Sequence, residues 1–436
     1  MKLKALPYFR AMKRWNWVFL VGSRLSAFKE GNLSAIITKI AAIATGVSVA
    51  VMIIATCLIS GFRETISEKV FGFWGHIQVL HNSSLNSYES APLIISNEMR
   101  DKLNNTKAVN YIFEGESFKT KGGIKHVQSY LFKPGIIGSK TQIEGILLKG
   151  LGKDFSWPLL EPFIKSGNRL DLNSEDPARE IILSEQTANR LQVTIGNSIL
   201  LHFVQEGSQI SRKLKVKGIF RTGLEEYDTK FALVDMRFLQ ELQGWNQNQI
   251  TGLEIILEDQ ADMEIMAAYL YENVLSDSLY TETIRQKLPN IFEWLELQTT
   301  NEQVINLLMI LVAIVNMSTA LLILIVERTN MVGILKALGS SNNNIQVLFM
   351  FFAGRILLWG LLLGNAIGLG LCYLEDKFKF IKLPEKDYYL SYAPVSFDWG
   401  KIALINGQTL LITLIVLIIP SFMVRRLTPV NAMKWK

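Results

Sequence analysis

Residues 303–326 read QVINLLMILVAIVNMSTALLILIV, a stretch without one charged side chain. Comparable uncharged apolar runs cover residues 40–62, 356–374 and 402–424. A helix rises about 1.5 Å per residue, so a run of about 20 apolar residues is long enough to cross the hydrocarbon core of a bilayer. The sequence therefore predicts a membrane protein with four transmembrane helices.

The unequal spacing of these runs predicts where the soluble part of the chain lies. A long, mostly polar stretch separates the first run from the second, whereas the other connections are short. A stretch of that length can bury a core of its own, and we expect two lobes. The predicted fold class is a membrane α-helical protein of four transmembrane helices, with a large α+β extracytoplasmic domain inserted between the first and second spans.

The apolar runs and their connections divide the chain into nine predicted segments. In chain order they are 1–32, a cytoplasmic segment with an interfacial helix; 33–62, the first span; 63–302, the extracytoplasmic domain; 303–326, the second span; 327–344, a cytoplasmic loop with a short helix; 345–374, the third span; 375–401, an extracytoplasmic loop; 402–424, the fourth span; and 425–436, a cytoplasmic tail.

The basic residues predict the orientation of the spans. Lysine and arginine near span ends are retained on the cytoplasmic side, and both ends of the chain are basic. The residues are Lys2, Lys4, Arg10, Lys13, Arg14, Arg24, Lys29 and Lys39 before the first span, and Arg425, Arg426, Lys434 and Lys436 after the last. Both termini are expected in the cytoplasm. These clusters, next to anionic membrane lipid, account for much of the net charge of +6, so no nucleic-acid partner is expected.

The long stretch 63–302 mixes strand-like and helix-like segments. Residues 75–80 and 213–218 have strand patterns, the second because Leu214 and Val216 alternate with lysines. Residues 181–183 and 231–234 predict strands, each followed directly by a helix. The two cysteines, Cys57 and Cys372, lie in predicted spans, so this domain is expected to fold without a disulfide of its own.

Ahead of the first span, apolar residues recur at helical spacing among basic ones, which predicts a helix lying in the membrane interface. The apolar set is Trp15, Val18, Phe19, Gly22, Leu25 and Phe28. Two interpretations stay open for this helix: a membrane-surface anchor and a contact for a cytoplasmic partner.

Small residues form stripes on two of the predicted spans. Ala42, Gly46 and Ala50 lie one turn apart in the first, and Gly360, Gly364 and Gly368 do so in the third. Small residues let transmembrane helices approach closely, so these stripes predict helix packing. Polar residues within membrane spans are costly, and the candidates are Asn316, Asn365 and Arg355, the last expected to reach the interface or to pair with Glu327.

Directly after the second span, residues 327–339 read ERTNMVGILKALG. Met331, Ile334, Leu335 and Leu338 follow helical spacing and predict a short amphipathic helix, which Gly339 would end in a left-handed conformation. Residues 340–344 offer caps for the next helix. An apolar ridge facing the cytosol favours a docking surface for a soluble protein, and the alternative is a helix lying flat on the inner leaflet.

The sequence offers no catalytic constellation. Its histidines, His76, His81, His126 and His202, lack metal-ligand spacing, and no phosphate-binding loop ending in Gly-Lys-Ser or Gly-Lys-Thr occurs. The chain is therefore not predicted to be an enzyme or to bind a cofactor or metal. Any ATP-driven work would require another chain.

Taken together, these residues resemble the permease subunits of lipoprotein-releasing ABC transporters, of the LolC/LolE type, within the FtsX and MacB group of permeases. The resemblance covers nearly the whole chain. Its pieces are 24–62 ending in Gly61-Phe62, 75–79, 327–339, 388–395 with Ala393-Pro394-Val395, and Pro420-Ser421 with Arg425, Pro429 and Ala432.

The resemblance implies a transport mechanism that needs several partners. A dimeric ABC ATPase, which binds the ATP and Mg²⁺, would grip a coupling helix formed by Asn330, Met331, Ile334, Leu335, Lys336, Leu338 and Gly339. A lipoprotein would be extracted from the outer leaflet of the bacterial inner membrane and passed to a periplasmic carrier. A second permease subunit would complete a homodimer or a LolC/LolE-type heterodimer. The substrate cavity would be lined by Ser48, Met52, Ala55, Ile59, Val304, Leu308 and Leu311.

One segment departs from the LolC pattern. LolC-type subunits carry a hairpin that hooks the carrier, and in residues 204–216 only the short connection 205–213 is expected between strands, without a proline at its tip. This favours a LolE-like role or a homodimer that serves both roles. Two other functions stay open: an FtsX-like mechanical relay that activates a cell-wall hydrolase, and a MacB-like export permease.

Overall fold

The computed structural model describes residues 33–84, 92–113, 115–139, 142–205 and 208–426. The predicted interfacial helix in 1–32, and Pro429 and Ala432, lie outside these residues. The chain divides into two compact units. We call them the helical unit (residues up to Glu64, Trp294–Lys382, and from Tyr392 on) and the sheet unit (Thr65–Glu293 and Leu383–Ser391).

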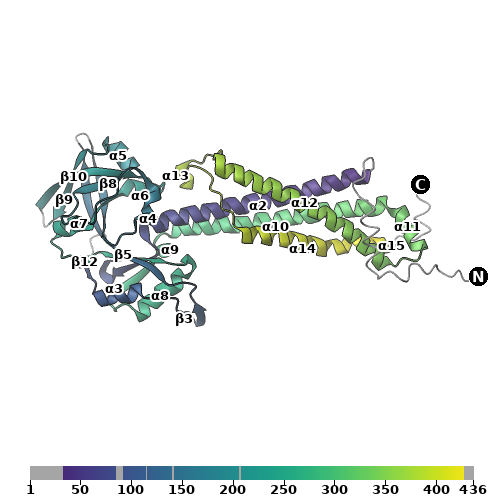
Figure 1. Cartoon of the computed structure of the whole chain (residues 1–436), viewed down its shortest axis with the longest axis horizontal. Coiled ribbons are helices and arrows are strands. Elements are labelled where there is room, and N and C mark those ends of the chain that lie inside the picture. The colour runs from purple at the N-terminus through teal and green to yellow at the C-terminus, as the bar shows by residue number, and fades with distance from the viewer. Residues whose placement is uncertain (1–32, 85–91, 114, 140–141, 206–207, 427–436) are drawn as a thin grey trace, which may run out of the picture. The chain divides into compact units, whose positions relative to one another are not determined.

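The helical unit is built around four long helices that lie side by side (Figure 1). They are α2 (Leu33–Trp74), α10 (Pro289–Glu327), α12 (Asn342–Phe378) and α14 (Trp399–Ser421), with the short helices α11 (Thr329–Ala337) and α15 (Met423–Arg426). Each long helix is long and apolar enough to cross a membrane, which confirms the four predicted spans. Two of these helices are longer than the apolar runs they contain, because their backbone hydrogen bonding continues into polar sequence. Helix α2 extends to Trp74, and α10 begins at Pro289.

Apolar side chains from all four long helices form the core of the helical unit. Fully buried members include Val49 and Met52 of α2, Met317 of α10, Phe349 of α12 and Leu417 of α14. The helices therefore have well-packed inner faces, and their remaining apolar side chains are partly buried or exposed.

The sheet unit is a mixed α+β domain. Its main sheet has ten strands in the order β14-β1-β13-β5-β6-β11-β8-β10-β7, and β9 pairs with β10 and β5. Two pairs, β6–β11 and β8–β10, are parallel and the rest are antiparallel. The strands are β1 (Ile77–His81), β5 (Ile124–Gly138), β6 (Ile143–Leu151), β7 (Ile164–Gly167), β8 (Glu180–Ser184), β9 (Ser198–Gln205), β10 (Ser208–Phe220), β11 (Phe231–Asp235), β13 (Gly252–Leu257) and β14 (Leu279–Thr283). This confirms the predicted fold class.

Short elements complete the sheet unit. Two small antiparallel pairs join β2 (Leu93–Ile94) to β12 (Gln249–Ile250) and β3 (Asn110–Phe113) to β4 (Glu116–Lys119). The helices are α3 (Asn97–Asn104), α4 (Trp157–Leu160), α5 (Glu185–Leu191), α6 (Glu225–Lys230), α7 (Met236–Gln243), α8 (Met263–Asn273), α9 (Ile284–Lys287) and α13 (Glu385–Tyr388), with 3₁₀ turns at Asn82–Ser84, Glu161–Phe163 and Gln260–Asp262.

Local predictions in the sheet unit are confirmed where strands meet helices. Strand β8 leads into α5, whose N-cap Ser184 accepts a hydrogen bond from the Thr187 N–H, and β11 leads into α7, capped by Asp235. In β10, Leu214 and Val216 are buried while Lys213 is exposed, as the alternation predicts.

The prediction that residues 205–213 form a connection between strands is wrong. Strands β9 and β10 continue through most of this segment, and their ladder extends from the Ser198–Lys215 pair to the Gln205–Ser208 pair. Leu201 and Phe203 are buried on one face of β9, and this alternation extends the strand further than the polar composition suggests.

Candidate functional site

The short helix predicted after the second span forms as α11, directly after α10 and Arg328. The helix ends at Ala337 with Leu338 as its C-cap, and Gly339 follows with a φ of 91°, in the left-handed region, as predicted. The Ser340 N–H donates to the Leu335 carbonyl (2.9 Å) and the Gly339 N–H to the Lys336 carbonyl (3.0 Å), so this turn satisfies carbonyls at the helix end. Ser341 then caps α12, as predicted for residues 340–344.

The four apolar residues predicted as one ridge do not share a single exposed face. Met331 and Leu335 are half-buried and pack against the core of the helical unit, whereas Ile334 and Leu338 are 52% and 68% exposed. Because α11 also packs on α12, one side of the ridge turns inward. The exposed face of α11 consists of Ile334 and Leu338 together with Asn330 and Ala337.

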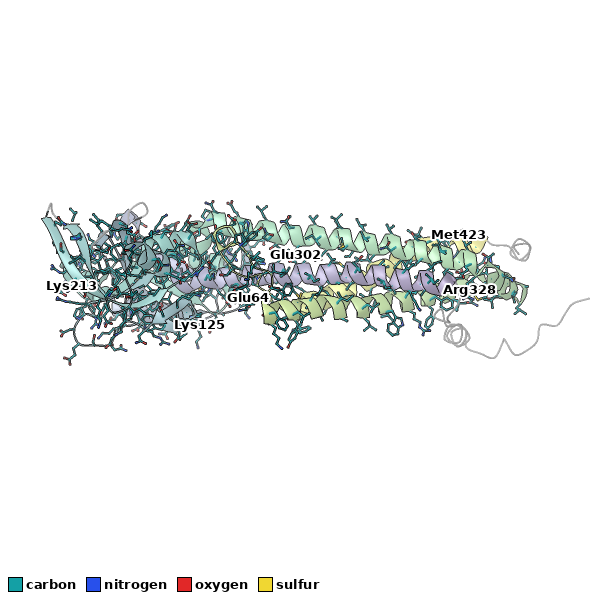
Figure 2. All side chains as sticks on the ribbon, turned by 90° about the horizontal axis from the view of Figure 1, so that it is seen from above. Glu64, Lys125, Lys213, Glu302, Arg328 and Met423 are labelled. Carbon is teal, nitrogen blue, oxygen red and sulfur yellow. The ribbon has the colours of Figure 1, made fainter. Side chains whose placement is uncertain are left out.

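Side-chain hydrogen bonds fix α11 and its neighbours at one end of the helical unit. The Lys336 ammonium donates to the Val424 carbonyl of α15 (2.9 Å), and burial lowers the pKa of this lysine. The Gln346 side chain of α12 donates to the Ser421 hydroxyl of α14 (2.8 Å). Figure 2 shows Arg328 and Met423 at this same end, with Glu302 towards the other. These hydrogen bonds hold α11 in a fixed position, with its exposed face directed away from the helical core.

The two small-residue stripes face each other between α2 and α12. A Cβ atom built at Gly364 would lie 2.6 Å from the Val49 Cβ and 2.7 Å from the Gly46 carbonyl oxygen. At Gly360 the nearest atoms belong to Thr45 and Ala42, and at Gly368 to Ile53 and Ala50. The absence of side chains at these glycines lets the two backbones approach closely.

The residues predicted to line a substrate cavity fall into two groups. Ser48 and Met52 are buried within the chain's own helices, and Ala55 and Ile59 are half-buried. By contrast Val304, Leu308 and Leu311 on α10 are each about half exposed, at 50%, 51% and 49%. Ser48 and Met52 therefore do not line an open surface in this structure, because they face the helical core.

Two polar contacts inside the helical unit have no counterpart in the sequence predictions. Asn365 of α12 pairs with Asn406 of α14 through both amides, the shorter hydrogen bond being 2.6 Å. Glu302 of α10, which is 7% exposed, accepts a hydrogen bond from the Thr56 hydroxyl (2.8 Å). The sequence identifies Asn365 as a polar residue in a span, but it cannot identify Asn406 or Thr56 as partners, because a contact with another helix leaves no signal in the spacing of residues along either helix.

The Gly61-Phe62 and Ala393-Pro394-Val395 motifs meet in the helical unit. A Cβ built at Gly61 would lie 2.4 Å from the Pro394 carbonyl oxygen, and the Ser396 N–H donates to the Cys57 carbonyl (3.0 Å). The segment before α14 therefore packs directly against the backbone of α2 at Gly61. Glycine is required at position 61 because the neighbouring atoms are backbone atoms, which cannot rotate away.

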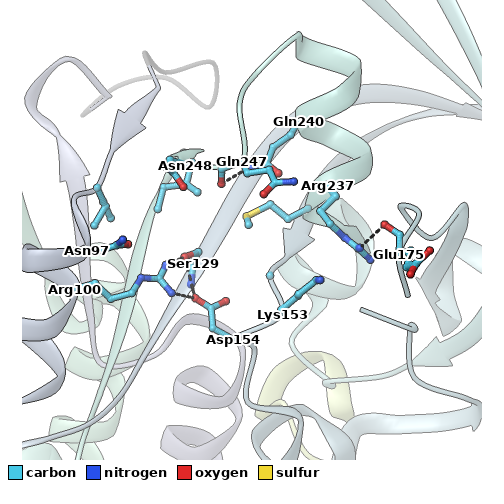
Figure 3. A pocket seen from close by; sticks show the side chains of 14 residues that line it. Asn97, Arg100, Ser129, Lys153, Asp154, Glu175, Arg237, Gln240, Gln247 and Asn248 are labelled. Carbon is cyan, nitrogen blue, oxygen red and sulfur yellow. Dashed lines mark hydrogen bonds and ion pairs between the residues drawn. The ribbon is translucent and has the colours of Figure 1, made fainter. Parts of the chain in front are cut away.

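The sheet unit contains a polar cavity of about 410 Å³, lined mainly by α3, α7 and the turn after β6 (Figure 3). Arg100 pairs with Asp154 (2.8 Å), and Arg237, which lines the opposite wall, pairs with Asp235 (2.7 Å). The lining residues include no aromatic side chain. Most of the cavity's charges are therefore neutralised by partners in the protein, and its chemistry points to no ligand class.

The histidines bind separate partners. The His76 ring accepts a hydrogen bond from the Leu257 N–H (2.9 Å), and burial, together with Lys125, lowers its pKa to about 4. His81, His126 and His202 contact Ser83, Asp154 and Ser211 respectively. Within the described residues, no three His, Cys, Asp or Glu side chains are grouped as a metal site would require.

Comparisons with known proteins agree with this architecture. The family model described as FtsX-like permease C-terminal matches residues 304–429. The chain is 21% identical over 432 residues to the lipoprotein-releasing system transmembrane protein LolC of Neisseria meningitidis serogroup B, covering 94% of this chain and 97% of that protein. It is 22% identical over 440 residues to LolE of Haemophilus influenzae, covering 96% and 99%.

A similar solved structure is the periplasmic region of MacB from Actinobacillus actinomycetemcomitans, with 10% identity, a TM-score of 0.33, and coverage of 49% of this chain and 91% of that one. The sequence relatives span the helices and the sheet unit alike. The chain is therefore similar to LolC and LolE over nearly its whole length, and its residues 304–429 match the FtsX-like permease C-terminal model.

Proposed function

We propose that this chain is the permease subunit of an ABC transporter that extracts lipoproteins from the outer leaflet of a bacterial inner membrane and passes them to a periplasmic carrier. ATP would be hydrolysed by a separate ATPase dimer. The observation that carries the proposal is the similarity to proteins named as lipoprotein-releasing system transmembrane proteins, which extends over 94% of this chain and 97% of its LolC relative.

In this proposal α11 receives the ATPase. Its exposed face offers Ile334 and Leu338, two apolar side chains of the kind that fill a pocket in a protein partner. Only Arg328 separates α11 from α10, which is one uninterrupted helix from Glu327 back to Pro289. A displacement of α11 would therefore move α10, and α10 continues to the chain segment that enters the sheet unit.

The exposed side chains of α2 and α10 would face lipid, a second permease subunit and the acyl chains of the lipoprotein. On α2 they are Ile36, Ile40, Ile43, Val47 and Val51, and on α10 they include Val304, Leu307, Leu308, Leu311 and Val315. Moving each acyl methylene from lipid to water costs about 0.8 kcal/mol, so extraction of several chains requires ATP or an apolar receiver. The proposed orientation places both termini in the cytoplasm and the sheet unit in the periplasm.

Purification in mild detergent followed by mass spectrometry tests the whole proposal. We expect an ABC ATPase and triacylated lipoproteins to co-purify with the chain. Recovery of a second, different permease would indicate a heterodimer, and its absence a homodimer. An ATPase recovered without any lipoprotein, together with normal lipoprotein sorting after depletion of the chain, would overturn the proposal.

The ATPase contact has a sharper test at α11. Leu338→Glu or Ile334→Glu places a charge on the exposed face, and we expect ATPase co-purification to fall at least about tenfold, as for a hot-spot residue, while membrane insertion is unchanged. Met423→Glu, at a 39% exposed residue of α15, is the matched control and should keep the ATPase. Leu335 is less suitable because it packs against the helical core. Unchanged recovery with both α11 variants would remove the coupling-helix assignment.

A second candidate function is a mechanical relay in which the ATPase moves the outer domain and nothing is transported. The match of residues 304–429 to the FtsX-like permease C-terminal model is compatible with this alternative as well as with lipoprotein release. It predicts that a cell-wall hydrolase co-purifies and that depletion causes a septation or wall defect. An export permease of the MacB type would instead carry a soluble or lipidic cargo without a lipoprotein defect.

A further inference from the structure

The connection between α12 and α14 contributes a segment to the sheet unit. Residues Leu383–Ser391, which include α13, cluster with that unit rather than with the helices on either side. The Leu383 N–H donates to the Ser391 carbonyl (3.0 Å), and this hydrogen bond closes the segment into a loop. The Ser391 hydroxyl also donates to the Glu385 carboxylate (3.1 Å) and holds that side chain in place.

The surface that receives this loop is the turn 221–224 between β10 and α6. The Asp228 carboxylate, which is 1% exposed, accepts hydrogen bonds from the Thr222 N–H (2.9 Å), the Thr222 hydroxyl (2.8 Å) and the Gly223 N–H (2.9 Å). Gly223 has a φ of 75°. A buried carboxylate with three donors makes this turn rigid before anything docks on it.

Three contacts of different chemistry join the loop to its surface. Arg221 bridges Glu385 of the loop and Glu185 of α5, the second at 2.8 Å. The Lys69 ammonium donates to the Tyr389 carbonyl (2.8 Å). At Gly223 the two backbones approach so closely that a Cβ atom would lie 2.9 Å from the Tyr389 carbonyl oxygen.

We infer that residues 383–391 and the turn 221–224 form a coupling clamp, through which movement of α12 and α14 is passed to the sheet unit. This path would act in addition to the covalent connections through α2 and α10, and the inference rests on the proposed function. The Arg221 and Glu385 side chains are 36% and 25% exposed, so the ion pair is partly hydrated. A pair of this kind contributes modestly to stability, so breaking it should weaken coupling and leave the fold intact.

The test measures lipoprotein released per ATP hydrolysed by the reconstituted transporter, made of the full chain with its ATPase. Glu385→Arg places two cations together, and we expect the ratio to fall about threefold to fivefold with an unchanged melting temperature. The charge swap Arg221→Glu/Glu385→Arg restores an ion pair across the clamp but sets the new glutamate beside Glu185, so it should recover part of the loss. Glu161→Arg, which breaks the exposed Arg169–Glu161 pair elsewhere in the sheet unit, is the matched control and should keep the ratio.

A covalent clamp gives an independent readout in one protein. In Arg221→Cys/Glu385→Cys the ion pair is absent, so the ratio should be low under reducing conditions and should return towards the wild-type value on oxidation. The native Cys57 and Cys372 are buried in the helices and should not interfere. A wild-type ratio in the reduced variant and in Glu385→Arg would overturn the clamp.

Hydrogen exchange separates failure of the clamp from failure of the proposed function. If the wild type hydrolyses ATP but releases no lipoprotein, the release proposal fails. The clamp is then judged by exchange in residues 383–391 and 221–224, which should rise together in Glu385→Arg. Unchanged exchange in both segments would overturn the clamp whatever the cargo.

Discussion

The interface between α2 and α12 and the centre of the sheet unit are held together in opposite ways. Between α2 and α12 the backbones come into close contact because Gly46, Gly360 and Gly364 have no side chains. In the sheet unit a fully buried ion pair, Lys149 with Glu254 at 2.6 Å, lies among the rings of Phe73, Trp74 and Tyr130.

The difference follows from what each environment can satisfy. A membrane helix bonds its own backbone, so the closest packing needs only small residues. The end of α2 in the sheet unit leaves free carbonyls, and the Lys149 ammonium donates to one of them, that of Phe73. Glu254 also accepts a hydrogen bond from Gln128 (2.8 Å), so the buried pair is well supplied with partners.

The largest effect is expected from filling the glycine interface. Gly364→Leu should prevent the helical unit from folding, because the atoms within 3 Å of a new Cβ include the Gly46 backbone, and overpacking against atoms that cannot move costs more than about 3 kcal/mol. Size-exclusion chromatography in detergent checks this. Gly370→Leu is the control on the same helix, since nothing lies within 4 Å of a Cβ there. Equal behaviour of the two variants would show that α2 and α12 do not pack through this stripe.

The second effect breaks the buried ion pair. Lys149→Met leaves the Glu254 carboxylate buried without its cation, which should lower the free energy of unfolding by about 3–5 kcal/mol. Lys149→Met/Glu254→Leu removes both charges and should recover part of this loss. Denaturant titration of the full chain measures both values. If the double variant has a lower free energy of unfolding than Lys149→Met, then Glu254 stabilises the unit through contacts other than its ion pair with Lys149.

These two regions also differ in how far the sequence predicts them. The glycine stripes, the four spans and the left-handed Gly339 are visible because the signal lies within one helix or one turn. The Lys149–Glu254 pair is not, because it depends on the registers that place β6 and β13 on either side of β5. The same holds for Gly61 with Pro394 and for Asn365 with Asn406, whose partners are far apart in sequence.

Helix α11 shows the limit of sequence prediction within a single element. Helical spacing correctly predicts that Met331, Ile334 and Leu335 belong to one short helix, and Leu338 is the residue that caps its C-terminal end. The spacing does not predict which side of that helix packs against the core, because an apolar ridge has the same sequence pattern whether it is buried in the protein or binds a partner. Only the packing of α11 against α12 separates the half-buried Leu335 from the exposed Leu338.

A third, smaller effect concerns pH in the sheet unit. The pKa of His76 is about 4 in the folded state against an ordinary value of 6.5, so the unfolded chain binds this proton more readily. The stability that neutral His76 contributes is complete above about pH 6.5 and is lost as the pH falls towards 4, which amounts to about 2–3 kcal/mol at pH 4.5. Comparing thermal unfolding of the wild type and His76→Gln at pH 7 and 4.5 checks this. The same pH dependence in both proteins would exclude His76 as its source.

The smallest effect tests whether a polar pair inside the membrane helices resembles the buried pair of the sheet unit. Asn365 and Asn406 also donate to carbonyls of their own helices, at Leu361 and Ile402, so each amide keeps a partner when the other is removed. A double-mutant cycle with Asn365→Leu and Asn406→Leu, measured by unfolding in mixed micelles, should give a coupling energy of about 0.6 kcal/mol. A coupling energy near that of Lys149 and Glu254 would mean that the helical unit depends on polar contacts as strongly as the sheet unit does. A small value would leave the apolar core of the four helices and the close glycine packing between α2 and α12 as the main sources of its cohesion.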